Sequence, residues 1–312
     1  MKKLIVFFLT LTALSCSNDE QVDQDVLKDE SGSVLEGKML SFKTEESFVE
    51  EYSNLAQLNT NELKAWVSSK KLIALLNVSD DSVEIEEDVL PKSRLVYSDA
   101  LKAVLNSDSK VKIGGKVLWL NERTFYLLKE SDVDKTSDEL VANKENLKAF
   151  GQLLSLSGSA KSLTSRGVIP NENRTKTFES DEMDVQGGRL RHVLDLFNET
   201  IVLNDQIQTS KMYLRSTLQY RSCSTWRCTW KEAMNARTIA STYYDGSSGD
   251  INKAWTMTGN IYAPGVSGTQ TFLVANWKLV SPLSNWYPNF VISGNVTCQV
   301  DGSTFTIPIS WY

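Results

Sequence analysis

Hydrophobic and polar positions follow two different patterns along the chain, and the pattern changes near residue 188. Up to about residue 156, apolar residues recur at helical spacing or alternate briefly around a Gly-Gly pair. Beyond residue 188, short β-branched and aromatic runs are separated by Gly, Pro, Asn, Asp and Ser. The first pattern is typical of mixed helices and strands, and the second is typical of antiparallel strands. We therefore predict an α+β N-terminal unit followed by an all-β, antiparallel sandwich domain.

The N-terminal unit, residues 38–156, begins with a predicted strand and two predicted helices. The strand spans residues 39–42, and Thr44 then caps the first helix, because a threonine hydroxyl accepts hydrogen bonds from N–H groups of a first turn. Asn59 and Glu62 have the spacing of a capping box, which predicts the start of the second helix.

The same unit continues with a predicted third helix, a hairpin and a trailing helix. The third helix spans residues 97–105. In residues 110–120, alternating apolar residues flank Gly114 and Gly115, and two adjacent glycines supply the positive φ values of a tight hairpin turn. Apolar residues at helical spacing over residues 138–156 predict the trailing helix.

The rest of the chain divides into a linker and a β domain. Residues 157–187 are polar and rich in Ser, Asn and Thr, which predicts a linker. Residues 188–312 form the predicted sandwich, and a closed barrel is the alternative architecture. Its predicted strands span residues 190–197, 212–220, 225–231, 238–242, 255–262, 271–279, 290–300 and 305–311.

The first residues have the organisation of a secretory signal. Lys2 and Lys3 precede an apolar run over residues 4–14, and Ser15 precedes Cys16. The apolar run is too short for a transmembrane helix, which needs about 20 residues. We therefore predict that the first fifteen residues are a signal peptide, and that the mature chain begins at a lipidated Cys16.

Residues 13–16, Ala-Leu-Ser-Cys, resemble a lipobox, although Leu14 stands where a smaller residue is usual. A plain signal with an incidental cysteine is the alternative. Residues 16–37 are too poor in apolar residues to bury themselves, which predicts a disordered acidic tether. Asp19 and Glu20 resemble the signal that exports lipoproteins of Bacteroidota-type bacteria to the outer face of the outer membrane. This resemblance implies a cell-surface location, with the periplasmic face as the alternative.

Net charge argues against nucleic acid as a partner. The whole chain has a formal net charge of −6, and loss of Lys2 and Lys3 with the signal makes the mature value −8. Such a chain is repelled by phosphate backbones, and no Lys/Arg cluster offers a basic patch. The expected partners are the membrane, through lipid on Cys16, and a glycan or a surface protein.

Three cysteines remain after lipidation of Cys16, so one of them has no partner within the chain. Cys223 and Cys228 flank four residues, which favours a disulfide across a hairpin loop in an oxidising compartment. A bridge from either of them to Cys298 is the alternative. A zinc site needs more His and Cys close together than this chain has, so we assign no metal and no cofactor.

The sequence contains no recognisable catalytic motif. The single histidine, His192, lies in a strand-like run with Asp195 on the opposite strand face, which favours a solvent-facing or structural histidine. Acidic residues cluster over residues 80–88 and 179–184, as in solvated loops. Residues 245–250, Asp-Gly-Ser-Ser-Gly-Asp, favour a hairpin loop over a calcium site. We therefore assign no catalytic residue, and whether the chain is an enzyme stays open with a preference against it.

Aromatic residues give the strongest suggestion of a binding surface. Most of those within strands are expected to fill the core, but Trp286 and Tyr287 lie beside Pro282 and Pro288 in a predicted loop, where core packing does not explain them. We predict this pair as the contact site. The tryptophans of the β domain are Trp226, Trp230, Trp255, Trp277, Trp286 and Trp311.

Two stretches in combination resemble segments of uncharacterised surface lipoproteins of Bacteroidota-type bacteria, which are families of unknown function. The stretches span residues 103–115 and 209–231. The resemblance supports the location and carries over no catalytic residue. The expected function is non-catalytic binding of an extracellular glycan or protein by a lipid-anchored surface protein. A hydrolase of extracellular polymers that uses carboxylates, and a structural envelope component, are the alternatives.

Overall fold

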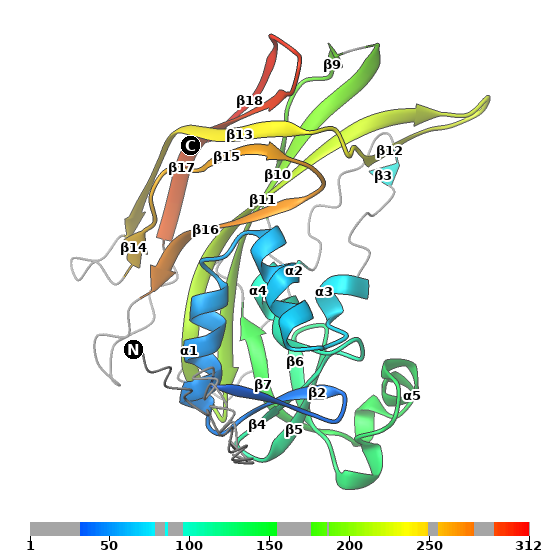
Figure 1. Ribbon diagram of the computed structural model, residues 1–312, viewed down its shortest axis with the longest axis vertical. Helices are drawn as coiled ribbons and strands as arrows, with labels where there is room; N and C mark the ends of the chain where they lie inside the picture. The colour runs from blue at the N-terminus through cyan, green and yellow to red at the C-terminus, as the bar shows by residue number, and fades with distance from the viewer. Residues whose placement is uncertain are drawn as a thin grey trace, which may run out of the picture. The chain divides into compact units, whose positions relative to one another are not determined.

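The computed structural model describes residues 32–78, 85–86, 96–154, 176–185, 187–248, 255–277 and 290–311. The described chain is mostly β-structure, with few helices (Figure 1). None of the described helices combines the length and apolar character that a membrane span requires. The signal peptide, Cys16, and the pair Trp286 and Tyr287 lie outside the described residues, so the interpretations placed on them stay predictions.

The N-terminal strands and helices begin where the capping signals predict. The Thr44 hydroxyl accepts from Ser47 N at the start of the first helix, and Asn59 forms a capping box with Glu62 at the start of the second. One prediction here is wrong, because residues assigned to the end of the tether form a strand that hairpins onto the next one. The elements are β1 (Ser33–Glu36), β2 (Met39–Phe42), α1 (Glu45–Leu55), α2 (Thr60–Ser69), α3 (Leu75–Val78), β3 (Ile85–Glu86) and α4 (Asp99–Val104).

The predicted Gly-Gly hairpin is confirmed. Strand β4 (Lys110–Ile113) pairs antiparallel with β5 (Lys116–Asn121), and Gly114 and Gly115 have φ values of 57° and 77°. Both angles lie in the left-handed region that glycine adopts without steric cost. Strand β6 (Thr124–Leu127) extends the meander beside β5.

The predicted trailing helix over residues 138–156 is wrong in its second half. The chain forms η1 (Glu130–Asp132), α5 (Ser137–Ala142) and η2 (Lys144–Asn146), and then strand β7 (Lys148–Leu154). Strand β7 pairs with β6 on one side and with β10 (Gly188–Leu203) on the other. At Gly151 an added Cβ would lie 2.3 Å from the Val202 carbonyl oxygen, so the strand approaches β10 more closely than a side chain allows. Pairing with two strands outweighs the helical spacing of the leucines.

Three of the C-terminal strands, over residues 188–203, 206–223 and 237–248, are longer than predicted, and two further strands lie within the predicted linker. Strands β8 and β9 pair with β10, so residues 176–179 and 183–185 belong to the sheet. The predicted strand over residues 255–262 is divided into β14 and the start of β15. The elements are β8 (Lys176–Glu179), β9 (Met183–Val185), β10 (Gly188–Leu203), β11 (Gln206–Cys223), β12 (Cys228–Glu232), β13 (Arg237–Ser248), β14 (Trp255–Met257), β15 (Tyr262–Val266), β16 (Gln270–Trp277), β17 (Phe290–Val300) and β18 (Thr306–Trp311).

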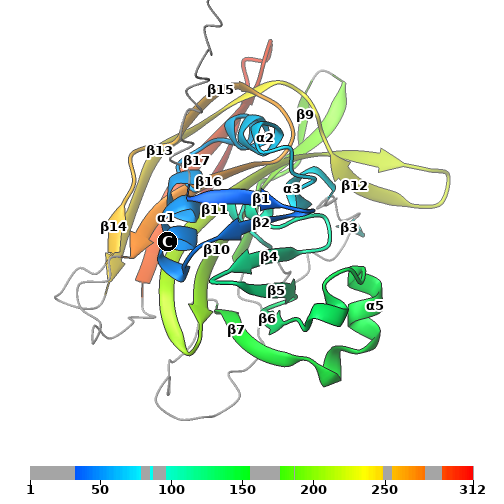
Figure 2. The same ribbon diagram turned by 60° about the horizontal axis from the view of Figure 1, so that its bottom comes forward.

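These strands form two sheets that share a core, which confirms a sandwich-like β architecture. The larger sheet runs β1-β2-β4-β5-β6-β7-β10-β11-β12-β3, and the smaller runs β15-β13-β17-β18 (Figures 1 and 2). Their common core contains Leu194, Leu214 and Val274 from the larger sheet, with Ile239 and Val296 from the smaller. Because β7 joins β6 to β10, one sheet continues from the helical region into the β region.

Strand β10 is covered on both faces. Every residue from 190 to 201 is buried, although the stretch includes charged residues. Leu194 and Leu196 point into the core between the sheets. Phe197 and Ile201 instead pack with residues of the helices, among them Tyr52 of α1. The strand therefore separates two cores, and polar side chains are enclosed on both of its faces.

Candidate functional site

The candidate site is the end of the β11–β12 hairpin, residues 223–228, which we call the hairpin tip. In both ribbon views this hairpin projects beyond the neighbouring strands (Figures 1 and 2). Cys223 and Cys228 are the last cross-strand pair of the ladder, and a disulfide joins them. The predicted pairing of these two cysteines is therefore confirmed, and Cys298 is a free, buried thiol.

Trp226 occupies the tip with its side chain outside the fold. Its exposed fraction is 95%, the highest among the large hydrophobic residues that the structure describes. The four-residue turn is closed by Ser224, whose N–H and hydroxyl both donate to the Arg227 carbonyl oxygen at 2.8 and 3.1 Å. The disulfide and these two bonds hold the backbone, so the indole is presented from a rigid turn.

The base of the same hairpin is packed. Trp230 is only 1% exposed, and the Arg191 guanidinium lies 4.3 Å from the centre of its ring. Arg191 also donates to Gln219 Oε1 at 2.9 Å and to a Glu179 carboxylate oxygen at 2.7 Å. Burial lowers the pKa of the Arg191 guanidinium, and the Glu179 carboxylate opposes that shift. A cation over an indole face is attractive, so this stack fixes the hairpin onto β10.

Two further contacts hold the hairpin at its sides. The short strand β3 pairs antiparallel with β12, with Ile85 opposite Trp230 and Glu86 opposite Thr229. On the other side, Arg221 Nη1 lies 4.0 Å from a carboxylate oxygen of Glu182. The tip is therefore an exposed end of an otherwise fixed strand pair.

A buried polar network lies elsewhere, where helices α1 and α4 meet β10. Glu199 Oε1 accepts from the Tyr52 hydroxyl and from the Ser98 hydroxyl, both at 2.6 Å, and Oε2 accepts from Ser98 N at 2.8 Å. The Tyr213 hydroxyl lies 2.8 Å from that of Tyr52. Burial raises the pKa of the Glu199 carboxyl, and the hydrogen bonds from Ser98 oppose this. The network attaches both helices to the sheet.

Lys211, opposite Glu199 on β11, belongs to the same network. Its ammonium donates to Asn276 Oδ1 at 3.0 Å and lies 5.4 Å from the centre of the Tyr52 ring. Burial lowers the pKa of Lys211 to about 8, although the Glu199 carboxylate acts in the opposite direction. A lysine with such a pKa is able to act as a base. Here the side chain is enclosed, and its residue is 5% exposed, so its contacts are those of a structural group.

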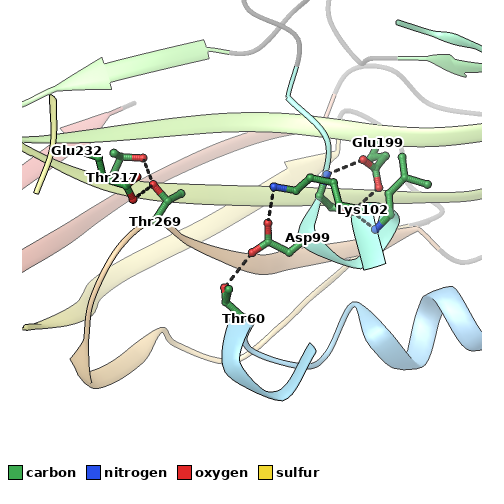
Figure 3. Close-up of polar contacts among 9 residues, drawn as sticks. Thr60, Asp99, Lys102, Glu199, Thr217, Glu232 and Thr269 are labelled. Atoms are coloured by element: carbon green, nitrogen blue, oxygen red, sulfur yellow. Dashed lines mark hydrogen bonds and ion pairs between the residues drawn. The ribbon is translucent and has the colours of Figure 1, made fainter. Parts of the chain in front are cut away.

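Two further polar groups join neighbouring elements (Figure 3). Asp99 of α4 accepts from the Thr60 hydroxyl at 2.9 Å and pairs with the Lys102 ammonium at 3.0 Å, which joins α2 to α4. In the second group, Thr269 donates to Glu232 Oε1 at 2.8 Å and lies 3.1 Å from the Thr217 hydroxyl. This group joins β11 and β12 to the segment before β16.

His192 is a buried, structural histidine, which is one of the two predicted alternatives. Its Nε2 lies 2.8 Å from the Ser216 hydroxyl, and its side chain is fully enclosed between the sheets. Burial and then the charge of Arg237 lower the pKa of His192 to about 3. Asp195 lies on the other strand face and accepts from the Thr177 hydroxyl at 2.7 Å. The strand therefore keeps the imidazole and this carboxylate apart, as the sequence predicted.

The remaining sequence candidates are only partly described. The first residues of the predicted loop over 245–250 belong to β13, where Asp245 pairs with Ser293 of β17, so that part is strand. Within the described ranges, no group of three or more His, Cys, Asp or Glu residues is placed to hold a metal.

Sequence reasoning missed Trp226. The available signal was its place in the middle of a four-residue gap between two cysteines, where no core position exists.

Comparisons with known proteins add little to this description. No protein-family model matches the chain, and no curated protein matches it. Among solved structures, the chain resembles a DUF4848 family protein from Bacteroides thetaiotaomicron VPI-5482 at 12% sequence identity. That likeness covers 89% of this chain and 100% of the other, with a TM-score of 0.21. At such a score it carries no argument about fold or function.

Proposed function

We propose that this chain is a lipid-anchored protein of the bacterial cell surface that binds an extracellular glycan or protein without catalysis, and that Trp226 makes the central contact. One observation carries the proposal: an almost fully exposed indole stands on a disulfide-closed turn. Tryptophan is enriched among residues that dominate binding energy, and a rigid turn reduces the entropy lost on binding. Residues 38–156 act in this proposal as an α+β support for the β region.

The lipid anchor rests on Cys16 and on the resemblance of residues 13–16 to a lipobox. The proposed location is the outer membrane, facing the exterior. Replacement of Cys16 by Ala is expected to move the protein from the membrane fraction to the soluble fraction. Unchanged partitioning would show that the anchor is wrong, and protease accessibility on intact cells distinguishes the outer face from the periplasmic face.

The test of binding uses the full mature chain, because strand pairing joins its two regions. Binding to a glycan array and to isolated surface proteins is compared for the native chain and for Trp226→Ala. Loss of a buried tryptophan contact is expected to weaken binding at least about tenfold, since a large apolar side chain contributes roughly 1.5–3 kcal/mol. Tyr262→Ala is the matched control, because Tyr262 is also an exposed aromatic of the β region, at 72%.

The hydrolase alternative gains no support from the two buried carboxylates of β10. The Glu199 oxygens are occupied by donors from Tyr52 and Ser98, and Asp195 is enclosed with Thr177. A general acid must reach the substrate oxygen that it protonates. Cleavage of a polymer by the intact chain, with binding unchanged in Trp226→Ala, would overturn the binding proposal in favour of the enzyme.

A further inference from the structure

The Cys223–Cys228 disulfide differs from a structural bridge in its exposure and in its position. Cys223 is exposed and Cys228 is half-buried, so a thiol in solution can approach the bond. The third cysteine of the β region offers a contrast. Cys298 is fully enclosed, and burial raises its pKa to about 11. Exposed disulfides are the ones that exchange readily, whereas an enclosed, protonated thiol is inert.

Contacts other than the disulfide hold the hairpin below the tip. Tyr220 pairs with Lys231 and Ser222 with Thr229, and the base is held by the stack of Arg191 on Trp230. The disulfide joins only the last cross-strand pair of these two strands. Its opening therefore leaves the strand pair in place and changes the tip alone.

At the tip, the disulfide is the strongest of the described constraints on Trp226. Once it is open, the turn is held by the two hydrogen bonds that Ser224 donates to the Arg227 carbonyl oxygen. Hydrogen bonds that compete with water contribute little net stability, so these two do not prevent repeated opening of an exposed turn. The backbone that carries Trp226 is then no longer held in one conformation.

We infer that the Cys223–Cys228 disulfide is a thiol-responsive clamp, which a dithiol opens in the folded protein and whose opening ends the rigid presentation of Trp226. The inference rests on the proposed function, because it describes the regulation of that binding site. Ligand affinity is high in the oxidised form and falls in the reduced form, since the ordering of the turn must then be supplied during binding.

The exchange is a balanced two-electron step. A thiolate of the dithiol attacks Cys223 Sγ, the bond between the two cysteine sulfurs breaks, and Cys228 leaves as a thiolate that takes a proton from water. The second thiol of the reagent loses its proton to water, and the resulting thiolate attacks the reagent's sulfur in the mixed disulfide. This closes the reagent's own disulfide and releases Cys223 as a thiolate, which takes a proton from water. The reagent is oxidised, and the protein gains two thiols.

The first experiment treats the mature chain carrying Cys16→Ala with dithiothreitol under native conditions, followed by iodoacetamide and mass spectrometry. The expected result is alkylation of Cys223 and Cys228 but not of Cys298, with unchanged circular dichroism. A bond that is reduced only after the protein unfolds in urea would overturn the inference.

The second experiment follows Trp226 itself by fluorine NMR of 5-fluorotryptophan-labelled protein, with its resonance assigned through Trp226→Phe. Reduction is expected to shift and narrow the Trp226 line and to leave the Trp230 line unchanged. The Cys223→Ser/Cys228→Ser double variant should show the shifted line with or without reductant. An unmoved Trp226 line after complete reduction would overturn the inference. These readouts use no ligand, so they fail or succeed separately from the loss of binding in Trp226→Ala.

Discussion

Trp226 and Trp230 stand four residues apart on one hairpin, and the structure treats them in opposite ways. Trp230 is buried against the Arg191 guanidinium, whereas Trp226 is exposed to solvent in the turn that the disulfide closes. Burial at the base stabilises the fold through apolar area and a cation over the ring. Exposure at the tip contributes nothing to that stability. Trp230 therefore stabilises the fold, whereas Trp226 is exposed and does not.

The largest loss of stability is expected when Trp230, at the base of the hairpin, is replaced. Trp230→Ala removes a fully buried indole and leaves Arg191 without its stacking partner, so the free energy of unfolding should fall by about 3–5 kcal/mol. Urea denaturation followed by circular dichroism measures this. Trp230→Phe should lose less, and equal stability of Trp230→Ala and the native chain would show that the base is not packed as described.

His192, which is enclosed between the two sheets, should make the free energy of unfolding depend on pH. Its pKa falls from 6.5 to about 3 on folding, so below pH 6.5 the unfolded chain binds a proton that the folded chain does not. Above pH 6.5 the imidazole is neutral in both states, so His192 does not reduce the free energy of unfolding. As the pH falls from 6.5 toward 3, the free energy of unfolding decreases by about 1.4 kcal/mol per pH unit. Urea midpoints measured across this range should show a smaller slope for His192→Gln.

Removal of the disulfide should lower the free energy of unfolding by less than the replacement of Trp230 by Ala. The loop that it closes spans five residues of sequence separation, so its loss in the Cys223→Ser/Cys228→Ser variant should lower the free energy of unfolding by about 2 kcal/mol or less. Thermal unfolding compares this variant with the native chain under oxidising conditions. A loss as large as that of Trp230→Ala would mean that the tip supports the fold.

The smallest effect on stability is expected at the tip. Trp226→Ala should change the free energy of unfolding by no more than about 0.5 kcal/mol, because the side chain has no packing to lose. The same urea titrations measure it. A clear destabilisation would show that Trp226 is covered in solution, and the contrast between the two tryptophans would disappear.

The sequence was a good guide wherever a local signal decides the structure. Thr44 and Asn59 start helices, and Gly114 with Gly115 turns a hairpin, because capping and positive φ act within a few residues. The pairing of Cys223 with Cys228 is also local. These features needed no knowledge of the rest of the chain.

Features that depend on distant partners were missed. Strand β7 was predicted as helix, because its leucines have helical spacing and its two neighbouring strands lie far away in sequence. The buried charges of β10 were also not expected. Glu199 is satisfied by Tyr52 and Ser98, which are 147 and 101 residues away, so no window around residue 199 reveals why a carboxylate is enclosed there.

The pairing of β7 with β10 also governs how the chain can be divided. Leu153 and Leu154 hydrogen-bond along the edge of β10 from outside the β region. A fragment that starts at residue 188 would expose that edge as unpaired backbone donors and acceptors, which is a template for aggregation. The two regions of the chain therefore fold as one unit, even though their amino-acid patterns differ so clearly.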